Sequence, residues 1–152
     1  MRPCPRLGGE ARSTDTLAAC PSKSSSAAQQ LLAAAESAEL AMLCARSGVH
    51  LMVLFGSAAR GDADPSDVDV AASFERGMET RVVSLLEELY RFTGFEDFDV
   101  LDLDRAFPLA RERALTGGRL LYQSQPGLFA TRQIAAIMSD STPTRCAESN
   151  WS

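Results

Sequence analysis

The stretch from Leu51 to Ser73 restricts the fold of this 152-residue chain more than any other part of its sequence. It reads LMVLFGSAARGDADPSDVDVAAS, in which an apolar run, a glycine-serine turn and a polar loop are followed by a second apolar run that contains Asp67 and Asp69. Short apolar runs that are bounded by glycine and by polar loops predict two buried strands. Because successive side chains alternate across a strand, we expect Asp67 and Asp69 to project from the same face.

The paired carboxylates of Asp67 and Asp69 suggest a binding site for a cation. Two neighbouring carboxylates repel each other, which raises the pKa of one of them unless a cation joins them. A divalent metal ion, which prefers hard oxygen ligands, is the simplest such cation. The alternative is that the two side chains form a solvated strand edge or cap a turn, without any ligand.

The turn before the carboxylates favours a ligand that carries phosphate. Gly56 lets a ligand approach the backbone closely, and the N–H and hydroxyl of Ser57 can face a phosphate. Arg60 adds a positive charge, and a short helix over residues 57–60 would add the favourable potential of its N-terminus. A glycine-serine turn alone is common, but beside the carboxylate pair it predicts a site for a nucleotide and its metal ions.

A third carboxylate is expected on the next predicted strand, FEDFDVLDL. The candidates are Asp97, Asp99, Asp102 and Asp104. Alternation places Phe98 and Val100 on the face that helices cover, so Asp99 falls on the face of Asp67 and Asp69. Asp102 falls on the other face unless a bulge intervenes. We therefore predict Asp99 as the third member of the site.

Charge and cysteine content narrow the function classes. The chain has a net charge of -5. Residues 1–26 have a net charge of +2, so the rest of the chain has a net charge of -7. This acidic body of the chain is a poor partner for nucleic-acid phosphates. The four cysteines lack metal-site spacing and are expected to be free thiols in a reducing cytosol. No apolar run approaches the roughly 20 residues that span a bilayer, and no signal-peptide core is visible. We expect a cytoplasmic protein that binds neither nucleic acid nor membrane.

Three segments are predicted along the chain. Residues 1–26 are rich in Ser, Thr, Pro and Gly and are expected to be disordered. Residues 27–138 are expected to form the folded domain, and residues 139–152 a flexible tail.

The pattern of apolar residues and of capping residues predicts four helices and four strands. The helices are expected over 27–46 (N-cap Ser26, end Gly48), 80–92 (cap Thr80), 108–115 and 127–138, and the strands over 50–55, 67–73, 95–103 and 119–123. On the last helix the candidate core positions are Leu128, Ile134, Ile137 and Met138. His50 is expected to be a strand-end residue and not a catalyst.

The segment GSAARGDADPSDVDV resembles the GSxxRG…SDxDx signature of the DNA polymerase β-like nucleotidyltransferase superfamily. Val53 to about Gln123 is more closely similar to the minimal nucleotidyltransferases, the MNT proteins, including the later FDVLDLDRAFPLARERALTGGRLLYQ. The resemblance implies an α+β fold of the polymerase β-like type, in which helices pack on one face of a mixed sheet and the active site lies on the other. The predicted domain over residues 27–138 would then be a nucleotidyltransferase domain.

The resemblance also implies roles for the site residues. Gly56 and Ser57 would contact the terminal phosphates of ATP, and Arg60 would support their loop. Asp67 and Asp69 would ligate two Mg2+ ions, and Asp99 would ligate one of them.

Many MNT relatives pair with a HEPN toxin, and some transfer AMP from ATP to a tyrosine of that toxin. This implies a protein adenylyltransferase that acts as an antitoxin, as a homo- or hetero-oligomer. Two alternatives stay open. One is an antitoxin that masks its partner without catalysis, and the other is an adenylyltransferase for a small molecule such as an aminoglycoside, although 152 residues leave little room for the helical domain that holds such a drug. A template-dependent polymerase is disfavoured by the acidic body.

Overall fold

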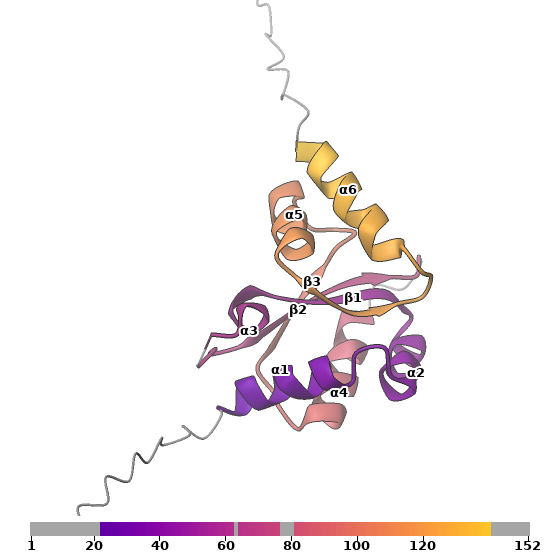
Figure 1. Ribbon diagram of the computed structural model, residues 1–152. Coiled ribbons are helices and arrows are strands. Elements are labelled where there is room, and N and C mark those ends of the chain that lie inside the picture. Colours follow the sequence, from indigo (N-terminus) through magenta and orange to yellow (C-terminus); the bar gives the residue numbers. More distant parts are fainter. Residues whose placement is uncertain (1–21, 63, 77–80, 141–152) are drawn as a thin grey trace, which may run out of the picture.

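The computed structural model describes residues 22–62, 64–76 and 81–140, which form a mixed sheet with helices on both faces (Figure 1). The elements in chain order are α1 (Lys23–Ala33), α2 (Ala38–Ser47), β1 (Val49–Phe55), α3 (Gly56–Arg60), β2 (Val68–Phe74), α4 (Arg81–Thr93), β3 (Phe98–Asp102), α5 (Pro108–Thr116), β4 (Arg119–Gln123) and α6 (Leu128–Asp140). The strand order is β3-β2-β1-β4. β1 runs antiparallel to β2 and β4, whereas β3 runs parallel to β2. The predicted α+β class with a mixed sheet is confirmed.

Each face of the sheet has its own hydrophobic core. On the face that α1, α2 and α4 cover, the strands contribute Met52, Leu54, Val68, Val70 and Ala72. On the face that α5 and α6 cover, they contribute Leu51, Val53 and Ala71, which pack with Ala114, Leu115 and Ala136. Burial of apolar area on both faces is the main source of stability for such a sheet. Asp69 lies between Val68 and Val70 in the strand, so alternation directs it toward the side of α5 and α6. The resemblance implied helices on one face and the active site on the other, but α5 and α6 also cover part of this second face.

The single helix predicted over residues 27–46 is wrong, because the chain forms two helices there. The amide of Glu36 donates a hydrogen bond to the carbonyl of Leu121 on β4 (3.2 Å), so the backbone pairs with the sheet where a continuous helix would pass. Glu36 takes a positive φ of 61°, and the hydroxyl of Ser37 then caps α2 by accepting from the amide of Leu40. α1 is capped by Ser22, not by Ser26. The predicted helix end at Gly48 is confirmed, since Gly48 is the left-handed C-cap of α2.

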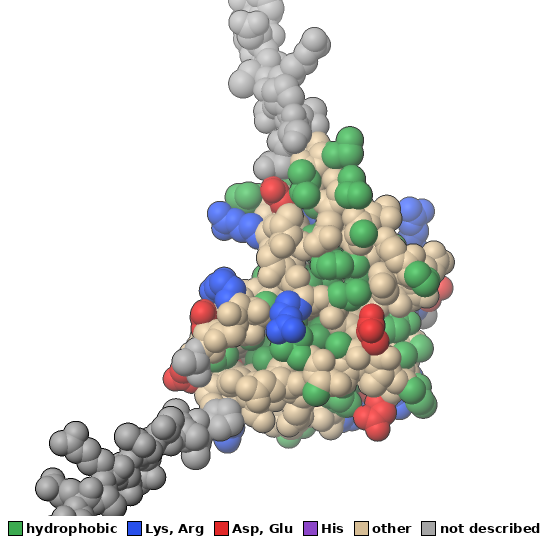
Figure 2. All heavy atoms as spheres, viewed as in Figure 1, with side chains coloured by type: hydrophobic (Ala, Val, Ile, Leu, Met, Phe, Trp, Pro, Cys, Tyr) green, Lys and Arg blue, Asp and Glu red, His purple; other side chains and the backbone are tan. Residues whose placement is uncertain are grey.

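The remaining helices and strands agree with the predicted ones to within a few residues. Thr80, predicted to cap the following helix, lies outside the described residues. The predicted core face of α6 is wrong for three residues: Ile134, Ile137 and Met138 are 59%, 48% and 67% exposed. α6 instead buries Ala136 against α5 and the sheet, and Figure 2 shows hydrophobic side chains at the surface in the region of α6. A helix at the rim of a domain contacts it along a narrow stripe, and small residues permit the closest approach.

The first helix begins earlier than the predicted folded domain. α1 begins at Lys23, inside the segment predicted to be disordered, because Ser22 and the serines that follow it support a helix start. The disordered segment and the flexible tail otherwise fall on residues 1–21 and 141–152, outside the described part, and stay predictions. No helix within residues 22–62, 64–76 and 81–140 is long and apolar enough to cross a membrane.

Candidate active site

The strand register places two of the three predicted carboxylates side by side. Asp69 of β2 and Asp99 of β3 are Cα partners in the parallel pairing, and Phe55 of β1 is the partner of Asp69 on its other side. Paired residues of neighbouring strands share a face, so the placement predicted for Asp69 and Asp99 is confirmed. Asp67 precedes the first residue of β2 and is exposed, as is Asp99, whereas Asp69 is half-buried.

The electrostatics of Asp69 reflect this arrangement. Its pKa is raised from the ordinary value of 3.8, first by burial and then by the negative charges of Asp67 and Asp99, while Arg60 opposes the shift. The three carboxylates and the guanidinium therefore act on one another through space. A cation among the carboxylates would relieve their repulsion.

The glycine turn packs directly against Asp69. β1 ends at Phe55, and Gly56 begins α3 with a positive φ of 72°, a conformation that glycine adopts without steric cost. A Cβ atom added at Gly56 would lie 2.0 Å from Oδ2 of Asp69, so only a glycine leaves room for the carboxylate. Ser57 follows at half-buried depth, and Arg60 closes the helix, where its guanidinium pairs with Asp62 at 3.3 Å.

Side-chain contacts hold the loop between α3 and β2. The hydroxyl of Ser24, on α1, donates a hydrogen bond to the carbonyl of Pro65. The hydroxyl of Ser66 donates to Oδ1 of Asp67 at 2.9 Å. The helix that precedes the sheet therefore helps to position the loop that delivers Asp67.

The other candidates for the third carboxylate lie elsewhere. Asp102 pairs in register with Ala72, toward the other end of β2. Oδ2 of Asp104 accepts from the hydroxyl of Ser73 at 2.8 Å, and its Oδ1 accepts from Arg132 at 3.2 Å. Asp97 precedes β3 and is exposed. Asp99 alone of the four is the register partner of Asp69.

The donor set suits magnesium by its chemistry. Carboxylate oxygens are the protein ligands that Mg2+ prefers, and Asp67 and Asp99 add to the effect of burial in raising the pKa of Asp69. Among the residues that the structure describes, no group of three or more His, Cys, Asp or Glu side chains is arranged to hold a metal ion. The assignment of Asp67, Asp69 and Asp99 as metal ligands remains a prediction.

A second concave region escaped prediction from the sequence. The structure forms a cavity of about 1120 Å³ at the other end of β1, β2 and β3, and several arginines line it. These arginines come from separate helices, strands and loops, and no spacing in the sequence links them. Only the three-dimensional fold brings them together.

Comparison with known proteins agrees with the fold of the chain. A family model described as "Polymerase beta, Nucleotidyltransferase" matches residues 39–127, more than half of the chain. The fold is similar to a chain in the crystal structure of a toxin–antitoxin with AMP-PNP, at 22% identity and a TM-score of 0.55, covering 67% of this chain and 84% of that one. It is also similar to a chain of the toxin–antitoxin MntA–HepT, at 20% identity and a TM-score of 0.50, covering 67% and 81%. No curated protein matches the chain. The matched segment contains the turn, Asp67, Asp69 and Asp99, and the chain belongs to the polymerase β nucleotidyltransferase family.

Proposed function

We propose that this protein is a Mg2+-dependent nucleotidyltransferase that transfers AMP from ATP to the hydroxyl of a tyrosine on a partner HEPN toxin, in the cytoplasm, and so acts as an antitoxin. The observation that carries the proposal is the pairing of Asp69 with Asp99 beside a glycine turn that packs on Asp69. Membership of the nucleotidyltransferase family supports the reaction class. The similarity to toxin–antitoxin structures, one of them with AMP-PNP, supports the partner and the nucleotide.

The residues of the turn would hold the nucleotide. Gly56 and Ser57 would contact its terminal phosphates, because the glycine exposes the backbone and the serine adds an N–H and a hydroxyl. Arg60 would contribute positive charge near those phosphates, and its field already reaches Asp69. The packing of Gly56 on Asp69 would bring the phosphate chain next to the carboxylates.

The carboxylates would hold the metal ions. Asp67 and Asp69 would bind both Mg2+ ions, and Asp99, from the neighbouring strand, would bind one. When bound, two Mg2+ ions supply stabilisation of the charge on the attacking and leaving oxygens, and they lower the pKa of the attacking hydroxyl. The protein itself would contribute orientation, since the register sets the spacing of Asp69 and Asp99 and the turn sets the position of the phosphates.

A transfer assay with the product of the adjacent gene tests the proposal. The two purified proteins are incubated with isotope-labelled ATP and Mg2+, and intact-mass spectrometry looks for the addition of AMP to the partner. The same reaction is run with Asp69→Asn and with the control Asp97→Asn, which removes an exposed carboxylate two residues before Asp99.

We expect an AMP adduct on a tyrosine of the partner with the wild type and with Asp97→Asn, and none with Asp69→Asn. Tight association without any adduct, unchanged by Asp69→Asn, would show instead an antitoxin that masks its partner. An adduct that forms equally well with Asp69→Asn would exclude the assigned site. Transfer to an aminoglycoside but not to the partner would identify a small-molecule acceptor.

A further inference from the structure

The cavity at the far end of the sheet lies well apart from the candidate active site. β1 pairs Phe55 with Asp69 at the active-site end and Val49 with Phe74 at the cavity end. Phe74 lies five positions after Asp69 in β2, which corresponds to about 17 Å along a strand. A ligand in the cavity would therefore occupy a site of its own.

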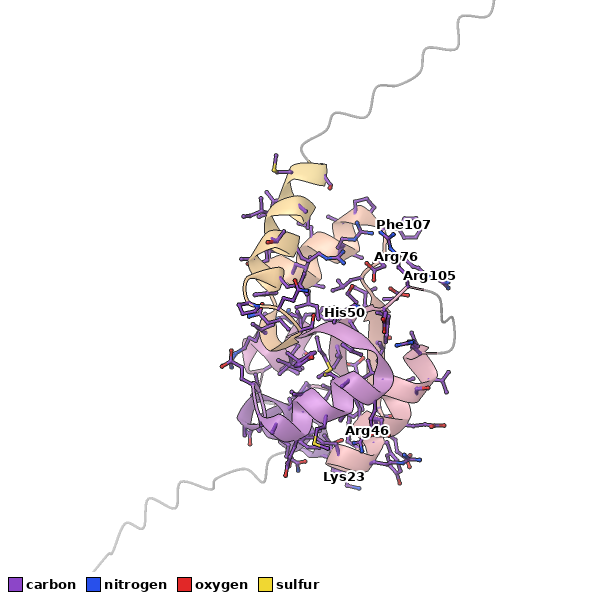
Figure 3. All side chains as sticks on the ribbon, turned by 90° about the vertical axis from the view of Figure 1, so that its right-hand side faces the viewer. Lys23, Arg46, His50, Arg76, Arg105 and Phe107 are labelled. Atoms are coloured by element: carbon purple, nitrogen blue, oxygen red, sulfur yellow. The ribbon has the colours of Figure 1, made fainter. Side chains whose placement is uncertain are left out.

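Basic side chains from separate parts of the chain line this cavity. They are Arg76, Arg81, Arg105 and Arg132, and His50 lies beside them in the lining. Figure 3 shows His50, Arg76 and Arg105 on one side of the molecule, with Arg76 and Arg105 near each other. Three carboxylates, Glu75, Asp102 and Asp104, line it as well, so the four arginines leave an excess of one positive charge in a chain of net charge -5. An excess of one sign of charge in a cleft attracts ions of the opposite sign.

The side chain of Arg81 is held in place, but not all of its hydrogen-bond donors have a partner. Its guanidinium lies so close to Gly48 that a Cβ atom there would be 1.1 Å from one of its terminal nitrogens. Its side chain is only 17% exposed, and its Nε is buried without a hydrogen-bond partner among the described residues. Its ion-pair partner Glu75 is 3.8 Å away and 63% exposed. Because Nε is buried, an anion in the cavity would bind Arg81 through the terminal nitrogens of its guanidinium, and Glu75 at 3.8 Å is too far away to accept a hydrogen bond from Nη1.

The carboxylates that also line the cavity are largely engaged with the fold itself. Asp104 accepts hydrogen bonds from Ser73, from the amide of Phe74 and from Arg132. Oδ1 of Asp102 accepts from the amide of Asp104 at 2.9 Å. Three of the four arginines have a carboxylate partner within the cavity: Arg132 pairs with Asp104 at 3.2 Å, Arg81 with Glu75 at 3.8 Å and Arg105 with Asp102 at 3.9 Å. Arg76 has no ion pair with any described residue, so its positive charge is left to act on a ligand.

We infer that this cavity is a second ligand site, distinct from the nucleotidyl-transfer site, and that it binds a phosphate-bearing anion with two or more negative charges. Arginine guanidinium groups match the geometry of phosphate oxygens and bind them through paired hydrogen bonds. α4 begins at Arg81, so the positive end of its dipole also faces the cavity. A cavity of about 1120 Å³ has room for an oligophosphate or a whole nucleotide.

A titration followed by amide NMR tests this site without any transfer reaction. The probes are inorganic phosphate, pyrophosphate and AMP, each added to the 15N-labelled full chain without divalent cations. We expect pyrophosphate to shift the amides of Gly48, Glu75 and Val82, which surround Arg81. Equal shifts there with AMP would identify a nucleotide site, and shifts with pyrophosphate alone would identify an oligophosphate site. Shifts confined to Gly56–Gly61, or none with any probe, would overturn the inference.

Variants of the arginines provide a second test of this anion site. Arg76→Gln combined with Arg81→Gln is expected to weaken pyrophosphate binding at least tenfold, while the control Arg46→Gln leaves it unchanged, because Arg46 pairs with Glu88 outside the cavity. If the Arg81 variant fails to fold, Arg76→Gln with Arg105→Gln, two exposed positions, is expected to weaken binding in the same direction. An unchanged dissociation constant in the folded double variants would contradict the site, whatever the outcome of the AMP-transfer assay.

Discussion

Asp69 and Asp99 are directly paired across the parallel strands β2 and β3, and the Cα of Gly56 packs against the carboxylate of Asp69. This relationship joins a turn suited to phosphate with carboxylates suited to magnesium. It also explains why the pKa of Asp69 is raised, since burial and two neighbouring acids both disfavour its charge. Electrostatic strain of this kind is common at functional sites, where a ligand relieves it.

The raised pKa of Asp69 predicts a pH-dependent effect of Asp69→Asn on stability. The folded protein holds the proton on this carboxyl more tightly than the unfolded chain does, so stability falls as the pH rises from the ordinary value of 3.8 through the raised one. Asp69→Asn has no ionisable group at this position, so its stability does not fall for this reason as the pH rises. We therefore expect Asp69→Asn to be more stable than the wild type at pH 7 in urea denaturation, with a difference that shrinks toward pH 4. Asp97→Asn is the control. If Asp69→Asn is less stable than the wild type at pH 7, the prediction is wrong.

Gly56→Ala is expected to destabilise the protein more than Gly61→Ala. Both glycines have positive φ angles, 72° and 77°, and an alanine there costs about 1 kcal/mol. Only at Gly56 would the new Cβ also collide with Asp69, whereas at Gly61 it would meet nothing within 4 Å. We expect a further loss of about 1–3 kcal/mol at Gly56 in chemical denaturation, together with loss of AMP transfer. Equal losses for the two variants would show that the contact with Asp69 has no energetic weight.

Glu36→Gly is expected to stabilise the protein by about 0.5–1 kcal/mol, because Glu36 is held at a left-handed φ that glycine adopts freely. The matched substitution Glu39→Gly falls in the first turn of α2 and should cost about 0.5–1 kcal/mol instead. Thermal or urea unfolding of both variants checks the prediction. Destabilisation by Glu36→Gly as large as by Glu39→Gly would mean that the break between α1 and α2 is misplaced.

The orientation of α6 predicts opposite sensitivity at two neighbouring positions. Ile134→Gln should change the free energy of unfolding by no more than about 0.5 kcal/mol, because the side chain is exposed. Ala136→Leu should cost about 1–3 kcal/mol, because Ala136 is buried in the core beneath α5 and α6. A large loss of stability for Ile134→Gln and a small one for Ala136→Leu would show that α6 packs through the face that includes Ile134, as the sequence predicts.

The sequence predicted the parts of the fold that depend on local patterns. The strand-turn-strand unit was predictable because apolar runs, Gly56 and the spacing of Asp67 and Asp69 are all contained within 23 residues. The position of Asp99 beside Asp69 followed from alternation, since a parallel strand preserves its face.

What depends on distant contacts was not predictable. The break at Glu36 results from a hydrogen bond to Leu121, 85 positions later in the chain, which no helix propensity reveals. Hydrophobic periodicity marked Ile134 as core, but the small Ala136 is the residue that fits against α5. The arginines of the second cavity carry no shared sequence pattern.

The role of Asp99 beside Asp69 is tested most directly by the rates of AMP transfer to the partner protein by Asp99→Asn and Asp97→Asn, measured at saturating ATP and Mg2+. The two variants remove exposed carboxylates two residues apart, but only Asp99 is the register partner of Asp69. Loss of a group that stabilises charge in the transition state costs about 10² to 10³ in rate. We expect a loss of this size for Asp99→Asn and a wild-type rate for Asp97→Asn, and equal rates for the two variants would exclude Asp99 from the site.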